Sequence, residues 1–251
     1  MKYRVLLLLP WVLAAVAAVF FVAVVPHDRD LGRLWNALIK GAAAVGGFLA
    51  YASYRRGDYM RVAWSALALS FVALAIRDAL AVLGLLGTSF VALNVPQLVS
   101  NVLGVLAFAY FAFAFRVAGL EYPSARGTKI VVYASCAIVG ASIAGVALVR
   151  HIAALGRTDI GVVGAIASDL CDLAALILIA PMLLTSVALR GGLLGRPWFM
   201  LTAAQVSWLV YDLLAFADAI ALREMARTLA CAYSLCAGLA QRGIKDEARE
   251  S

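Results

Sequence analysis

Charged side chains are scarce in this sequence of 251 residues: they make up 14% of the chain, whereas 65% of it is hydrophobic. A soluble domain carries about 25% charged residues, because water must wet its surface. The mean hydropathy of +0.97 points in the same direction. This composition excludes an ordinary soluble globular protein and predicts a single domain whose surface faces lipid.

Histidine and cysteine are also rare, with two His and four Cys. The cysteines lie inside apolar segments, with no CxxC spacing and no neighbouring histidine, so neither a zinc site nor a disulfide framework is indicated. Paired axial histidines for haem are missing from those segments, and we expect no cofactor. The enzyme motifs HExxH and GxSxG are missing too. Among enzymes, a membrane-embedded aspartate-based enzyme acting on lipid stays as an alternative.

Eight apolar runs are long enough, at about 20 residues, to cross a hydrocarbon core of about 30 Å. The predicted fold class is therefore an all-α integral membrane protein with about eight transmembrane helices. The first run follows Lys2 and Arg4 as in a signal peptide, but its length is that of a full span. The eighth run is short and contains Arg227, so it either spans the membrane or lies along its surface. The runs are 5–25, 34–54, 62–86, 91–115, 129–149, 160–189, 197–221 and 225–241.

The net charge of +7 comes from bases in short loops between apolar runs, which argues against a nucleic-acid partner. With the N-terminus in the cytoplasm, thirteen of the 21 Lys and Arg residues fall on the cytoplasmic side and six, including Arg223 and Arg227, on the outer side. The positive-inside rule then predicts a cell inner-membrane protein with both termini in the cytoplasm. Residues 242–251 form a short cytoplasmic tail.

Two pairs of similar segments indicate an internal repeat. Residues 22–33 (VAVVPHDRDLGR) and 146–157 (VALVRHIAALGR) are identical at seven of twelve positions and place His27 opposite His151. A second match aligns Asp78 with Asp212 at the same internal spacing from an Arg-Gly pair and a tryptophan. The chain then divides into halves of about 1–120 and 125–245. Because each half has four spans, the halves insert in parallel.

Polar residues inside the predicted spans converge on the outer half of the bundle. Ionisable groups are costly in a bilayer, at about 2.5–3.5 kcal/mol each, so they face the interior and often mark a site. Four carboxylates against two bases leave an excess of negative charge: either some carboxylates carry a proton, or a cation occupies the site. The alternative is that these groups only pair with each other across helices. The candidate ligand- or ion-binding residues are Lys40, Arg77, Asp78, Asn94, Gln97, Asn101, Asp169, Asp172, Gln205 and Asp212.

Two further patterns have two interpretations each. His27 and His151 either form a symmetric proton or metal site at the outer face, or are interfacial residues retained with the repeat. The stripe of Phe108, Phe111 and Phe115 is expected to face lipid or a partner.

Three classes of function fit these features. The polar pocket and the parallel repeat favour a small transporter or channel for a cation, a proton or a small polar ligand. The small size and the charged tail favour a ligand-sensing or accessory subunit of a larger membrane complex. The aspartate-based lipid enzyme is the third. The expected partners are the lipid bilayer and either another membrane protein or further copies of the chain.

Overall fold

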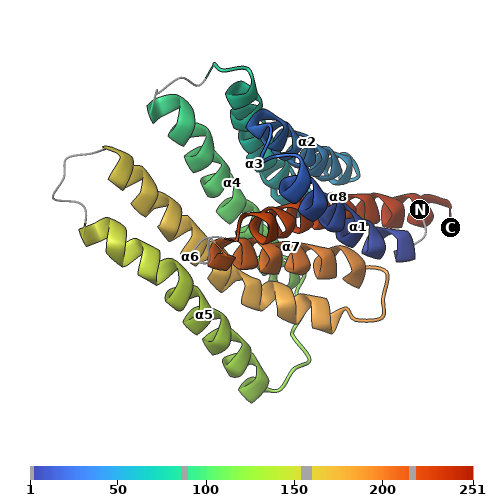
Figure 1. Cartoon of the computed structure of the whole chain (residues 1–251). Helices are drawn as coiled ribbons and strands as arrows, with labels where there is room; N and C mark the ends of the chain where they lie inside the picture. Colours follow the sequence, from blue (N-terminus) through green and yellow to red (C-terminus); the bar gives the residue numbers. More distant parts are fainter. Residues whose placement is uncertain (1–2, 86–89, 154–159, 215–218, 251) are drawn as a thin grey trace.

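The computed structural model describes residues 3–85, 90–153, 160–214 and 219–250, and all regular secondary structure in these ranges is α-helical (Figure 1). Each predicted apolar run corresponds to one helix, and the connections between the helices are short. In chain order the helices are α1 (Tyr3–Ala23), α2 (Arg29–Ala52), α3 (Tyr59–Val82), α4 (Phe90–Val117), α5 (Arg126–Ala153), α6 (Ile160–Ala188), α7 (Gly195–Leu214) and α8 (Ile220–Glu250).

Local sequence signals explain where several helices begin and end. The side chain of Asp28 caps α2, because its Oδ1 accepts a hydrogen bond from the backbone N–H of Asp30 at 2.9 Å. Helix α3 ends before Gly84, whose φ of +67° is in the left-handed region that glycine adopts readily. The backbone N–H of Leu85 then donates to the Leu80 carbonyl at 3.0 Å, which closes the helix end.

Five helices of the described chain are long and apolar enough to cross a membrane, which supports a helical membrane protein. Helices α2, α7 and α8 are not among them; each carries ionisable residues such as Lys40, Asp212 and Arg227. The number of eight spans therefore stays a prediction. The five segments are Val5–Ala23, Tyr59–Val82, Asn94–Val117, Arg126–Ala153 and Val162–Ala188.

The prediction of a short eighth helix was wrong. Helix α8 has 31 residues, runs through the middle of the bundle and packs against α1, α2 and α7 (Figure 1). Its central part is rich in Ala, Ser, Cys and Gly, small residues that let neighbouring helices approach closely. The charged end of the chain continues the same helix beyond the packed region. The length of the apolar run underestimated the length of α8, because a helix in the interior of the bundle does not need an apolar surface that faces lipid.

Helices α2 and α8 cross at a backbone-to-backbone contact made by two glycines. A Cβ atom built on Gly238 would lie 2.0 Å from the carbonyl oxygen of Gly46, and one built on Gly46 would lie 2.7 Å from the Cα of Leu235. Next to it, a Cβ on Gly47 would lie 2.9 Å from the Cβ of Ala68 on α3. Larger side chains would force these helices apart, so the small residues of α2 fix how closely it packs.

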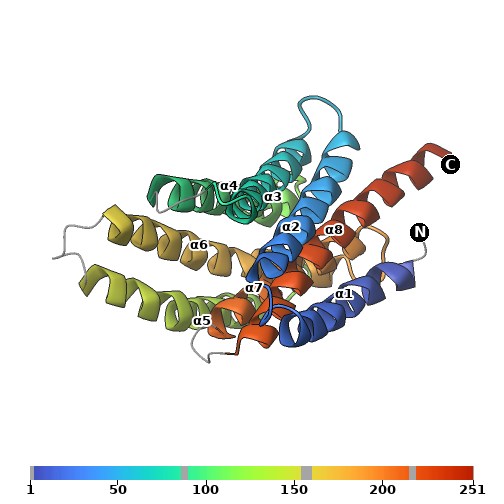
Figure 2. The ribbon, with the colours of Figure 1, turned by 45° about the horizontal axis from the view of Figure 1, so that its top comes forward.

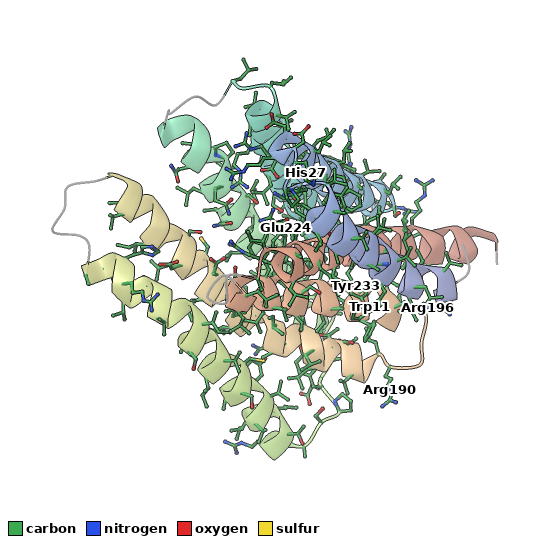
Figure 3. All side chains as sticks on the ribbon, viewed as in Figure 1. Trp11, His27, Arg190, Arg196, Glu224 and Tyr233 are labelled. Carbon is green, nitrogen blue, oxygen red and sulfur yellow. The ribbon has the colours of Figure 1, made fainter. Side chains whose placement is uncertain are left out.

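The bundle has two ends, which we name by what they hold. The His27 end is where α1, α3, α5 and α7 finish and α2, α4, α6 and α8 begin; the terminal end holds both chain termini, as Figures 1 and 2 show from two directions. Helix α5 packs against α6 at one side of the bundle, and α1 packs against α8. Figure 3 places His27 and Glu224 toward the His27 end, and Arg190 and Arg196 toward the terminal end.

The terminal half of the bundle is filled by a dense core. Trp64, Phe111, Met182 and Met200, from α3, α4, α6 and α7, are each fully buried. The rings of Trp64 and Phe111 are 5.0 Å apart between centroids in an edge-on arrangement. The expectation that the phenylalanine stripe of α4 faces lipid or a partner was wrong, because all three rings point inward. The residues of this stripe are Phe108, Phe111 and Phe115.

Candidate functional site

The polar side chains of the helices gather in the His27 half of the bundle, opposite the dense core. The first group is an ion-pair cluster between α2 and α3. The ammonium group of Lys40 on α2 contacts Oδ2 of Asp78 on α3, and Lys40 is only 2% exposed. The guanidinium group of Arg77 donates to the other oxygen, Oδ1, at 3.0 and 3.1 Å. Two bases therefore share one carboxylate, and this cluster carries an excess of one positive charge.

A chain of hydrogen bonds leads from this cluster across the bundle. Arg77 donates to the amide oxygen of Gln97 on α4, and the Gln97 amide nitrogen donates to Oδ1 of Asn101 at 3.0 Å. Asn101 in turn donates to the hydroxyl oxygen of Ser168 on α6 at 2.6 Å. Polar contacts thus connect α2, α3, α4 and α6 at one level of the bundle.

We expect Asn101→Ala to lower the free energy of unfolding by about 1 kcal/mol, since interhelical hydrogen bonds in membranes contribute about 0.6 to 2 kcal/mol. Reversible unfolding in mixed micelles measures this change. Val102→Ala, at the 52% exposed neighbouring position, is the control and should have a smaller effect. Equal losses in the two variants would contradict a stabilising role for the chain of hydrogen bonds.

The two repeat-related histidines have different surroundings. His151 Nδ1 lies 2.6 Å from Oδ2 of Asp169, which joins α5 to α6. His27 lies in the turn between α1 and α2 and is exposed to the surroundings. The structure therefore brings one histidine to a candidate site residue and leaves the other at the surface. Within the described ranges, no three His, Cys, Asp or Glu side chains are placed to share one metal ion.

A cavity of about 340 Å³ lies next to the chain of hydrogen bonds, between α3, α4, α6, α7 and the start of α8. Its lining is partly apolar and aromatic and partly polar. Its apolar lining includes Leu74, Phe71, Phe108 and Trp208. Its polar and charged lining consists of Ser70, Gln97, Ser100, Asn101, Ser168, Cys171, Asp172, Gln205, Tyr211, Asp212 and Arg223.

Two carboxylates in the cavity, Asp172 on α6 and Asp212 on α7, repel each other. Neither forms an ion pair within 4 Å among the residues that the structure describes, although the Arg223 guanidinium group is near enough to attract Asp212. Gln205, two turns before Asp212 on the same face of α7, is 4% exposed and has no hydrogen-bond partner in the described part of the chain. Buried amides are normally hydrogen-bonded, so the Gln205 side chain can still form hydrogen bonds with a molecule in the cavity.

Helix α8 supplies basic residues next to the cavity, among them Arg223 and Arg227, which the sequence predicted on the outer side of the membrane. Arg227 donates to the hydroxyl of Tyr211 and lies 2.8 Å from Oε2 of Glu224. Arg223 also packs on Tyr211, with its guanidinium carbon 4.4 Å from the ring centroid. Their spacing in the sequence could have indicated this helix: residues 223, 224 and 227 lie on one helical face, immediately before a run of small residues.

The structure divides the ten predicted site residues into groups. Five of them line the cavity, and three form the ion-pair cluster beside it. Asp169 binds His151 instead, and Asn94 lies in the first turns of α4 outside the described cavity lining. The cavity residues are Gln97, Asn101, Asp172, Gln205 and Asp212, and the cluster is Lys40, Arg77 and Asp78.

Comparison with known proteins gives no relative from which to transfer a function. No protein-family model, curated protein or solved structure matches this chain significantly. Any functional conclusion therefore depends on the site itself.

Proposed function

We propose that this protein is an eight-helix membrane protein that binds a cation, a proton or a small polar ligand in the cavity of its His27 half. The observation that carries the proposal is a set of polar groups in the cavity lining: the half-buried carboxylates Asp172 and Asp212, neither in an ion pair within 4 Å among the described residues, and the buried amide Gln205. Buried carboxylates need a proton, a base or a cation nearby. In the Lys40–Asp78–Arg77 cluster, two bases neutralise the carboxylate. In the cavity, Arg223 is the only base in the described lining for two carboxylates.

The packing of the helices supports the proposed arrangement in two parallel halves. The contacts of α2 with α3 and of α3 with α4 have counterparts in α6 with α7 and α7 with α8. The contact between α2 and α8 likewise has a counterpart between α6 and α4. The first helix of each half is packed differently, since α1 contacts α8 and α5 contacts α6. The cavity, with lining from α3, α4, α6 and α7, would then lie between the halves.

We place the cavity toward the outside of the inner membrane, with both termini in the cytoplasm. The bases of the loops at the terminal end support this orientation through the positive-inside rule. These bases, which lie in the loops or in the first turn of the helix that follows, include Arg55, Arg56, Arg126, Arg190 and Arg196.

A transporter or channel must give its ligand access to both sides of the membrane. The dense core around Trp64 and Phe111 closes the terminal half, so transport would require the two halves to move against each other there. The same closed core favours a second candidate function, a ligand-sensing or accessory subunit that binds from one side. Flux of a bound cation into liposomes containing the purified protein would favour transport; binding without flux would favour sensing.

The binding proposal predicts that a double variant, Asp172→Asn with Asp212→Asn, abolishes ligand-induced thermal stabilisation. The probes are sodium, potassium, magnesium and n-butylammonium chlorides, together with a pH series. A ligand at 100 times its Kd stabilises the folded protein by about 2.7 kcal/mol, which a thermal melt in detergent detects.

Asp30→Asn is the matched control, because Asp30 is an exposed residue of α2, a helix that does not line the cavity, and its substitution should leave the stabilisation intact. The proposal fails if no probe stabilises the natural protein, or if the shift persists in the double variant.

A further inference from the structure

The matched aspartates of the two proposed halves have different neighbours. Asp78 on α3 receives the ammonium group of Lys40 from α2. Its counterpart in the repeat, Asp212 on α7, receives no base from α6; this helix instead brings a second carboxylate, Asp172, to the same cavity. The first half thus contains a buried ammonium group, that of Lys40, beside its aspartate. The second half has two carboxylates, Asp172 and Asp212, and no ammonium group beside them.

The polar lining of the cavity matches the donors of a primary ammonium ion. Such an ion has three N–H donors and no acceptor, and the cavity offers acceptor oxygens on Asp172, Asp212 and Gln205. Gln205 gives independent evidence for a ligand, because it is 4% exposed and lacks a hydrogen-bond partner among the described residues. The charged lining also leaves one excess negative charge after Arg223 is counted, which a monocation neutralises.

The apolar part of the cavity lining indicates that the ion carries an organic group. A volume of about 340 Å³ lies in the range of small-molecule sites and exceeds the need of a bare ion. Phe108 and Trp208 line this volume, and aromatic faces attract organic cations. A hydrated metal ion would leave this apolar surface without a partner.

We propose that the cavity binds a small primary organic ammonium ion, held by Asp172, Asp212 and Gln205 as Lys40 is held by Asp78 in the other half. This inference rests on the proposed binding function of the same cavity and specifies its ligand class. A quaternary ammonium ion carries the same charge but cannot donate hydrogen bonds to the three acceptors.

The experiment compares n-butylammonium, tetramethylammonium and sodium chlorides at equal ionic strength, by calorimetric titration of the full-length protein in detergent. We expect n-butylammonium to bind at least tenfold more tightly than tetramethylammonium or sodium. Asp172→Lys should place an ammonium group inside the cavity, abolish n-butylammonium binding and raise the melting temperature of the ligand-free protein. Asp30→Asn should bind n-butylammonium like the natural protein.

If Asp172→Lys does not fold, Gln205→Leu decides, because loss of an acceptor for a charged donor should weaken n-butylammonium binding about tenfold. The inference is overturned if tetramethylammonium or sodium binds as tightly, or if these variants retain the natural affinity for n-butylammonium. Binding of an inorganic cation that depends on Asp172, without amine binding, overturns the ligand class and leaves the proposed function standing. Failure of every probe overturns both.

Discussion

Gly238→Ala, the addition of a single methyl group, is expected to lower the free energy of unfolding by about 3 kcal/mol, at the upper end of the usual cost of overpacking. The new Cβ would lie 2.0 Å from the carbonyl oxygen of Gly46, a backbone atom that cannot rotate away. Helices α2 and α8 would have to separate, and α8 is the central helix that also contacts α1 and α7. Equilibrium unfolding in mixed micelles, monitored by tryptophan fluorescence, measures the loss.

Gly41→Ala on α2 is the matched control for this prediction. A Cβ at Gly41 would meet no atom within 4 Å, and alanine favours a helix by about 1 kcal/mol over glycine. This variant should therefore be as stable as the natural protein or more so. Similar stabilities for Gly238→Ala and Gly41→Ala would show that the close crossing of α2 and α8 does not hold the bundle together.

Asp78→Asn is expected to cost about 3–5 kcal/mol, because it leaves the buried charge of Lys40 without a counter-ion. Lys40 is 2% exposed, so water cannot replace the lost carboxylate. Adding Lys40→Met to Asp78→Asn should recover most of the loss, since the uncompensated charge is then removed. The measurement is the same unfolding equilibrium, carried out on both single variants and the double variant.

Asp172→Asn provides the contrast, because the same chemical change is made at a carboxylate without an ion pair among the described residues. Removing a charge that Asp212 repels should leave the ligand-free stability unchanged or increase it. If Asp78→Asn and Asp172→Asn destabilise the protein equally, the distinction between an internally paired cluster and an open site is wrong.

The positions of the helices could be predicted from the sequence because hydropathy is a local property. Runs such as 62–86 and 129–149 correspond to α3 and α5 within a few residues. The prediction was less accurate where a helix lies in the interior. Small and polar residues weaken the apolar signal of α8. The predicted run began at residue 225 and left out Arg223, although α8 begins at Ile220 and brings both Arg223 and Arg227 to the ring of Tyr211.

The gathering of polar residues in one half of the bundle could also be predicted, from depth along each span and from helical spacing. Gln97 and Asn101, four residues apart, do share a face and bond to each other. Their grouping into a separate cluster and cavity could not be predicted. That distinction depends on which helices touch, and Lys40 and Asp78 are brought together from two different helices.

Sequence alone was enough to predict that this chain forms long apolar helices suited to a membrane, with the few ionisable groups inside these helices concentrated in one half of the bundle. Composition, run length and periodicity contain this information, because each depends on neighbouring residues alone. Helix packing established three things that the sequence did not predict: Lys40 neutralises Asp78, Asp172 and Asp212 share a cavity, and the α4 phenylalanines face inward. These outcomes depend on contacts between helices distant in the chain, where the bare backbones at Gly46 and Gly238 set how closely two helices can pack.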